Sequence, residues 1–115
     1  MSDDLARLQQ ELRTFARERD WERYHTPRNL AALISSEAGE LLALFRWDQN
    51  SVVERPKEVR QEIADVFLGV LRMADLAGID LVEAADEKLK LNAEKYPPEA
   101  NSGPDSTPPG FPRRI

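Results

Sequence analysis

The hydrophobic positions along the chain recur at intervals of three and four residues, the spacing of one face of an α-helix. The clearest stripe consists of Val59, Ile63, Val66, Phe67 and Val70. No segment shows a convincing alternation of apolar and polar residues of the kind that marks a half-buried strand. The pattern therefore predicts an all-α domain whose four helices cover residues 3–19, 27–47, 56–77 and 80–96.

Residues that begin and end helices stand at the edges of these stripes. Thr26 followed by Pro27 is typical of an N-cap and a first helical position, and Pro56 is placed to open the third helix. Ser2 is placed to cap the first helix, and Gly78 is a plausible C-terminal stop for the third. The polar segment 48–55 is predicted to be a loop.

The composition changes at Pro97. Six of the chain's eight prolines lie from there onward, with serine, glycine and asparagine between them. Such a segment has few apolar groups to bury. We therefore expect a folded domain over residues 1–97 and a flexible, disordered Pro-rich tail over residues 98–115.

Size and charge narrow the classes of function. A chain of 115 residues suffices for one domain, but so small a monomer buries a limited fraction of its surface, which favours association into an oligomer. The net charge of -5 argues against a nucleic-acid binder, which usually has a basic face. The absence of cysteine excludes disulfides, thiolate zinc sites and cysteine nucleophiles.

The chain is also expected to act away from membranes. Its first residues are acidic and mixed, unlike a signal peptide. No apolar run approaches the roughly 20 residues that span a bilayer. We therefore expect a cytoplasmic protein without a membrane or nucleic-acid partner.

Two pairs of acidic residues carry the candidate chemistry. Glu37 and Glu40 are three residues apart on the second predicted helix, and Glu62 and Asp65 are three apart on the third. Residues at this spacing share a helix face, so each pair can direct two carboxylates to one point. Both pairs border apolar stripes, where like charges repel each other unless a cation lies between them.

A magnesium site explains this arrangement, because Mg²⁺ prefers carboxylate and water oxygens. Spacing alone leaves open that the acids are ordinary solvated helix residues, since the chain has 21 of them. A di-iron carboxylate bundle fits poorly, because it normally needs a Glu-x-x-His motif on each of two helices. The only histidine, His25, lies outside the predicted helices.

The strings Glu37-Ala38-Gly39-Glu40 and Glu62-Ile63-Ala64-Asp65 resemble the E-x-x-E … E-x-x-D signature of the MazG-like nucleotide pyrophosphohydrolases. The flanking strings look like the dCTP pyrophosphatase branch of that superfamily. They are Glu18-Arg19-Asp20-Trp21, His25, Pro27-Arg28-Asn29-Leu30, Leu44-Phe45-Arg46-Trp47, and Lys88, Asn92 and Lys95-Tyr96-Pro97. The resemblance covers residues 8–97, nearly all of the predicted folded part.

The resemblance implies a four-helix MazG-like bundle that assembles as a dimer of dimers, with a simple dimer as the alternative. It implies hydrolysis of a nucleoside triphosphate, dCTP or a modified dCTP, to the monophosphate and pyrophosphate, for nucleotide-pool sanitation. The cofactor would be Mg²⁺, with Mn²⁺ as a substitute. The metal ligands carry over to Glu37, Glu40, Glu62 and Asp65.

Substrate-binding roles also carry over from the resemblance. Trp21 and Trp47 match positions that enclose the base. The remaining matches are to positions that handle phosphates and sugar, and they are Lys88, Asn92, Lys95 and Tyr96. We also count His25 among the substrate-binding residues, although a structural hydrogen-bonding role fits it better than a catalytic one. Each of these residues has a plainer interpretation as a core, interface or helix-end residue.

Our mechanistic hypothesis is that a water molecule attacks the α-phosphorus and pyrophosphate leaves. Glu40 or Glu37 would orient that water as general base, and Lys88 and Lys95 would stabilise the leaving pyrophosphate.

The chain departs from the family pattern at the base pocket. Where the animal enzymes of the dCTP branch have a histidine on the first helix and a tyrosine on the third, this chain has Leu12 and Gly69. Ser36 stands where many MazG proteins have a further glutamate. Two alternatives therefore stay open: a dUTP-type or phosphoribosyl-ATP-type hydrolase with the same metal site, and a non-enzymatic helical oligomerisation or regulatory module.

Overall fold

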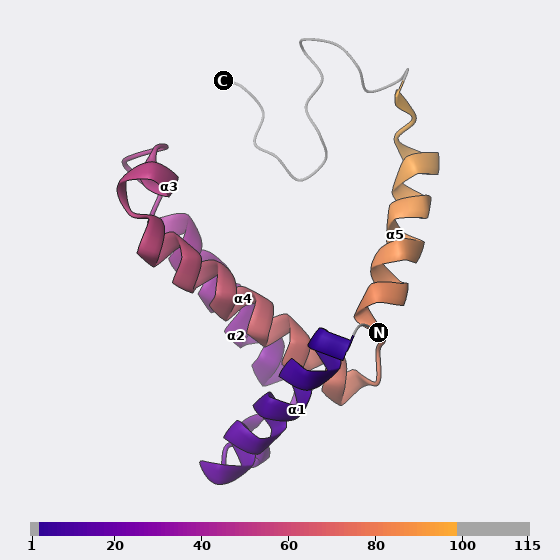
Figure 1. Cartoon of the computed structure of the whole chain (residues 1–115). Helices are drawn as coiled ribbons and strands as arrows, with labels where there is room; N and C mark the ends of the chain where they lie inside the picture. The colour runs from indigo at the N-terminus through magenta and orange to yellow at the C-terminus, as the bar shows by residue number, and fades with distance from the viewer. Residues whose placement is uncertain (1–2, 99–115) are drawn as a thin grey trace. The chain divides into compact units, whose positions relative to one another are not determined.

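The computed structural model describes residues 3–98, and every regular element among them is helical (Figure 1). The all-α prediction is therefore confirmed. The elements are α1 (Asp3–Glu18), the 3₁₀ turn η1 (Glu22–Tyr24), α2 (Pro27–Ala43), α3 (Ser51–Glu54), α4 (Pro56–Ala77) and α5 (Leu81–Lys95). Ser2 and all of the predicted tail except Pro98 lie outside the described residues.

The described chain falls into two units, one ending at Leu81 and the other beginning at Val82. In the first unit, α2 and α4 form the main helix pair, and α1 and α3 each pack on α4 (Figure 1). The second unit contains α5 after its first residue and is described by itself. None of the helices over residues 3–98 has the length and apolar character that crossing a bilayer requires.

The buried apolar side chains come from α1, α2 and α4. Leu30 of α2 and Leu71 of α4 are almost fully buried, and Ala16, Val59 and Ala74 complete the buried apolar set. Gln9 of α1 is also buried, and its Nε2 donates a 3.1 Å hydrogen bond to the Leu71 carbonyl oxygen. The donor that burial removes from water therefore has a partner on α4.

Local chemistry places the helix ends. The Thr26 hydroxyl oxygen accepts a 3.1 Å hydrogen bond from the Asn29 N–H, so Thr26 caps α2 as predicted. Gly78 ends α4 at φ 68°, a left-handed conformation that glycine adopts without a Cβ penalty. At the end of α1, Asp20 adopts φ 57° and the Trp21 N–H bonds the Ala16 carbonyl oxygen. This left-handed turn directs the chain from α1 into η1.

The region between α2 and α4 differs from the prediction. Helix α2 ends at Ala43, and a short helix α3 occupies part of the predicted loop 48–55. The reason is a tertiary contact: the hydroxyl of the fully buried Ser51 donates to the carbonyl oxygens of Leu44, at 2.5 Å, and Asp48, at 3.1 Å. The bond to Leu44 satisfies a carbonyl group at the end of α2, and the two bonds together hold Ser51 at the start of α3.

Large apolar side chains remain exposed in both units. Trp47 after α2 is 91% exposed and Leu42 on α2 is 72% exposed. The other strongly exposed ones include Val53 on α3, Ile63 on α4, and Leu89 and Leu91 on α5. Large apolar side chains exposed to this degree are candidates for contact with a partner.

Candidate functional site

Three carboxylates converge where α2 packs on α4. Glu37 and Glu40 of α2 and Glu62 of α4 each offer one oxygen, and these oxygens all lie within 4.8 Å of one another. The helices approach closely here, because a Cβ atom added at Gly69 of α4 would lie only 3.1 Å from Cγ1 of Ile34 on α2. The predicted convergence of the two acidic pairs is thus present for three of the four residues.

This acidic cluster contains unsatisfied buried atoms. Oε2 of Glu37 and Oε2 of Glu62 are buried without a hydrogen-bond partner, and they are the only such side-chain atoms among residues 3–98. Burial raises the pKa of Glu37, and the neighbouring Glu40 raises it further through a shared hydrogen bond and its charge. Burial also raises the pKa of Glu62, followed by the charges of Glu40 and Asp65. Ionised together, these groups need a positive partner.

A divalent cation fits this donor set. The three oxygens are close enough to contact one ion, they are the hard ligands that Mg²⁺ prefers, and two of the carboxylates carry an oxygen that no protein donor satisfies. Asp65, the fourth predicted ligand, is not one of the three converging residues. Its charge nevertheless acts on both Glu37 and Glu62, so it contributes to the negative potential of the cluster.

A cavity of about 610 Å³ adjoins the acidic cluster, and Glu37 and Asp65 form part of its wall. Most of the remaining wall is hydrocarbon. Leu8, Leu12 and Phe15 come from α1, Leu33 from α2, and Leu68 and Gly69 from α4. The two departures from the family pattern, Leu12 and Gly69, therefore both lie in this wall. A cavity with an apolar body and a few polar groups at one side is typical of small-molecule sites.

Trp21 also lines the cavity, as its predicted role with the base requires. Its ring meets Phe15 edge to face, with ring centroids 5.5 Å apart and planes at 71°. Such an arrangement is favourable for two aromatic rings. On Phe15, the Arg19 guanidinium carbon lies 3.5 Å from the ring centroid. These contacts hold the aromatic end of α1 at the cavity.

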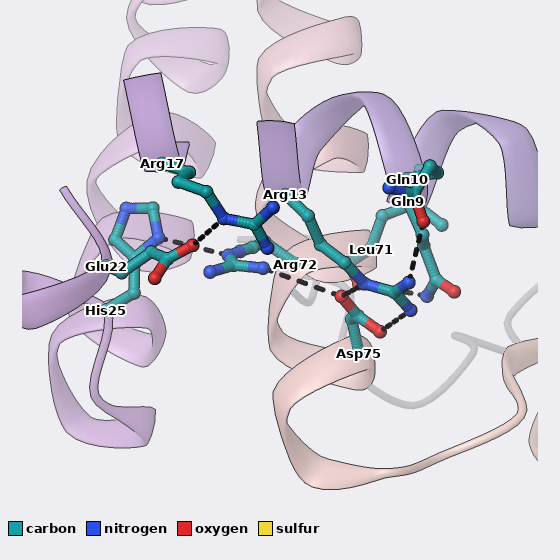
Figure 2. Close-up of polar contacts among 9 residues, drawn as sticks. All are labelled: Gln9, Gln10, Arg13, Arg17, Glu22, His25, Leu71, Arg72 and Asp75. Atoms are coloured by element: carbon teal, nitrogen blue, oxygen red, sulfur yellow. Dashed lines mark hydrogen bonds and ion pairs between the residues drawn. The ribbon is translucent and has the colours of Figure 1, made fainter. Parts of the chain in front are cut away.

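His25 lines the same cavity and is joined to a residue that the sequence analysis missed. The buried Arg72 of α4 donates a 3.1 Å hydrogen bond from Nε to Nδ1 of His25 (Figure 2). Arg72 also pairs with Asp75 one helical turn later, at 3.5 Å. The available signal was a basic residue on the predicted third helix with an acidic residue three positions later.

Of the other predicted substrate residues, Trp47 belongs to the same unit as the cavity and the remaining four belong to the second unit. Trp47 is almost fully exposed and lies outside the cavity wall. Lys88, Asn92 and Lys95 lie on α5 and Tyr96 directly after it, in the unit that is described by itself. There the Tyr96 N–H bonds the Asn92 carbonyl oxygen at 2.8 Å and the Lys95 ammonium lies 5.4 Å from the Tyr96 ring centroid. Their roles with substrate stay predictions.

Comparison with known proteins identifies the family. The model of the MazG-like family matches residues 32–106, which include all four predicted metal ligands. The chain belongs to the MazG-like family. The predicted family is therefore confirmed, and Trp21 and His25 lie on the N-terminal side of the matched segment.

Relatives of this MazG-like chain include mammalian proteins. It is 35% identical over 108 residues to dCTP pyrophosphatase 1 of Rattus norvegicus, an alignment that covers 88% of this chain and 62% of the relative. It is 35% identical over 102 residues to dCTP pyrophosphatase 1 of Homo sapiens, covering 83% and 58%. The chain thus spans about three fifths of the length of these relatives, as the two coverages show.

A solved structure supports the fold of the MazG-like chain. A pyrophosphatase from Archaeoglobus fulgidus superposes with a TM-score of 0.79 at 39% sequence identity. The match covers 84% of this chain and 95% of the archaeal one. The similarity therefore extends over almost the whole of that protein.

Proposed function

We propose that this MazG-like chain is a magnesium-dependent pyrophosphohydrolase, which cleaves a nucleoside triphosphate to the monophosphate and pyrophosphate. The observation that carries the proposal is the trio of converging carboxylates, two with unsatisfied buried oxygens, beside a mostly apolar cavity. The names of the relatives, dCTP pyrophosphatase 1 and pyrophosphatase, support the same reaction class. Clearance of unwanted deoxynucleotides is the role that we infer.

The charge of the substrate explains why a cation belongs to the proposal. A triphosphate and a cluster of carboxylates repel each other, so substrate cannot approach the acids alone. Glu37, Glu40 and Glu62 would hold the cation, with Asp65 beside them. When bound, magnesium would supply positive charge that offsets the negative charges of the carboxylates and of the substrate.

The protein groups would divide the remaining work. The cavity would take the base, and stacking on Trp21 would contribute roughly 1–3 kcal/mol by analogy with single-strand nucleic-acid binding. Glu40 or Glu37 would orient the attacking water and accept its proton as general base. On resemblance alone, the proposal keeps Trp47 as a base contact and the α5 group Lys88, Asn92, Lys95 and Tyr96 as phosphate and sugar contacts.

The base is proposed to be cytosine or a modified cytosine, following the relatives' names. One observation favours testing other bases: Leu12 and Gly69 line the cavity where the resemblance leads us to expect a histidine and a tyrosine. These residues remove polar groups and volume from the wall. A dUTP-type substrate or a base with a bulky substituent is therefore the second candidate.

A homo-oligomer is also part of the proposal. Trp47 and Leu42 are exposed to a degree that is unfavourable in water, and a second copy of the chain is the simplest partner that covers them. We propose a tetramer, with a dimer as the smaller alternative. Trp47, placed outside the cavity of its own chain, would then approach a base only within such an assembly.

The decisive experiment follows pyrophosphate and phosphate release from a panel of canonical and modified nucleoside triphosphates, with and without Mg²⁺. We expect magnesium-dependent release of pyrophosphate, reduced at least about 100-fold in Glu37→Gln. Glu58→Gln, an exposed acid on α4, is the matched control and should retain activity. Sedimentation of the same preparation gives the mass of the active species. A folded protein that releases no pyrophosphate from any nucleotide would reject the proposed reaction.

A further inference from the structure

Four polar side chains form a chain of contacts from α1 across α4 to His25, which lines the cavity (Figure 2). Arg13 of α1 binds Asp75 of α4 with two hydrogen bonds, from Nε at 2.7 Å and from Nη2 at 2.5 Å. Asp75 lies 3.5 Å from Nη1 of Arg72, and Nε of Arg72 donates to Nδ1 of His25 at 3.1 Å. We call these four residues the Arg13–His25 ladder. Nothing in the proposed hydrolysis uses its two arginines or Asp75.

The chemistry of arginine fixes the state of the last member. A guanidinium group carries only donors and keeps its proton at any pH at which proteins fold. Nδ1 of His25 must therefore accept with its lone pair, and the single ring proton of the neutral imidazole lies on Nε2. Protonating Nδ1 would break this hydrogen bond and place a second positive charge against Arg72.

We propose that Arg72 is a positioning residue that locks His25 as the neutral Nε2–H tautomer, so that His25 offers one N–H donor to an acceptor atom of the nucleotide in the cavity. The lock itself follows from the ladder, and the nucleotide role rests on the proposed function. A donor of fixed tautomer favours a base or sugar oxygen over an amino group at that point, because only the oxygen can accept. His25 would thus contribute to specificity, with Arg72 acting through it.

The charges around His25 agree with a neutral ring. Burial lowers the pKa of His25 first, and the positive charge of Arg72 lowers it further. Glu22 of η1 acts in the opposite direction, but it pairs with Arg17 at 3.3 Å. The other titratable groups that line the cavity or join the ladder are Glu11, Glu37, Asp65, Asp75 and Arg13.

Arg72 can be removed without leaving Asp75 alone, because Arg13 still holds both oxygens of that carboxylate. Three variants on α4 then separate the effect of the Arg72 hydrogen-bond donor from the effect of its charge. Arg72→Met removes the donor and the charge, Arg72→Gln keeps an N–H donor without the charge, and Arg60→Met removes an exposed arginine from the same helix as the control.

The test uses the fact that His25 is the only histidine in the chain. Untagged, ¹⁵N-labelled, nucleotide-free protein gives ring signals of one residue only, and long-range ¹H–¹⁵N correlation reads which nitrogen is protonated. We expect a midpoint of titration below the ordinary value of about 6.5 and, at pH values above that midpoint, a neutral ring that carries its proton on Nε2. An Nδ1–H ring, or a midpoint at or above that value, in the unmodified protein would overturn the lock.

The variants test the link to nucleotide binding. In Arg72→Met we expect mixed tautomers, a higher titration midpoint, and a KM raised about tenfold and more steeply dependent on pH between 6 and 8, with kcat less affected. Arg72→Gln should restore the Nε2–H form and bring KM most of the way back to the value of the unmodified protein. Arg60→Met should match the unmodified protein in both respects. A raised KM in Arg72→Met with an unchanged tautomer would overturn the role of His25. An intact lock in a protein that hydrolyses no nucleotide would confirm the tautomer and reject the nucleotide role.

Discussion

Helix α4 carries two pairs of charged residues with the same spacing, and the two pairs differ in whether their side chains find partners. Glu62 and Asp65 are three residues apart and both negative, and the structure leaves a buried oxygen of Glu62 without a partner. Arg72 and Asp75 are also three apart, but their charges are opposite and their contacts extend to Arg13 and His25. The spacing sets which side chains share a face. The signs of the charges decide what the pair does. Like charges repel each other until a cation binds, whereas opposite charges form contacts that hold the side chains in place without a ligand.

The largest effect on stability should come from breaking the Arg72–Asp75 pair. Asp75→Asn leaves the buried guanidinium of Arg72 without its carboxylate and removes the two-bond contact with Arg13. We expect the free energy of unfolding to fall by about 3 kcal/mol, as for other buried ion pairs that lose one member. Urea denaturation measures it. The exposed ion pair of Arg7 with Glu11 supplies the control, because Glu11→Gln should cost well under about 1 kcal/mol.

A substitution in the Glu62–Asp65 pair should change the stability of the metal-free protein in the opposite direction. Glu62→Gln removes one charge from the cluster, so we expect the metal-free protein to become more stable in the presence of a chelator. The unmodified protein should gain about 2.7 kcal/mol from Mg²⁺ at a hundred times its dissociation constant, and Glu62→Gln should lose most of that gain. Thermal unfolding with and without Mg²⁺ compares the two. Equal stabilisation of both proteins would show that Glu62 is not a ligand.

The sequence predicted those features whose causes lie close together along the chain. Pro56 and Gly78 mark the ends of α4, and the bounds predicted from them are the observed ones. The acidic pairs were visible because helical spacing alone places each pair on one face. Helix α3 was missed because Ser51 gains its partner seven residues away, at the Leu44 carbonyl oxygen. The contact of Arg72 with His25 joins residues 47 positions apart, so the local sequence around either residue does not predict that the two are partners.

The smallest effect is the dependence of stability on pH. Asp75 should determine the acidic limb of the stability curve, where stability falls at low pH, and the acidic cluster should determine the neutral limb. The pKa of Asp75 is lowered, first by its hydrogen bonds from Arg13, so its stabilisation is present above about pH 4 and is lost as pH falls through the lowered value. The pKa values of Glu37 and Glu62 are raised by burial, so the folded state binds protons more tightly than the unfolded chain does. In metal-free protein their effect favours folding below about pH 4 and is lost as pH rises through the raised values.

Urea unfolding between pH 3 and 8 in a chelating buffer should therefore show maximal stability in mildly acidic solution. Asp75→Asn should flatten the acidic limb and leave the neutral limb unchanged, whereas Glu62→Gln should do the reverse. Mg²⁺ should flatten the neutral limb of the unmodified protein, because a bound cation favours the ionised carboxylates. An identical neutral limb in Glu62→Gln and the unmodified protein would mean that the acidic cluster is solvated, and the contrast between the two pairs on α4 would then lose its physical basis.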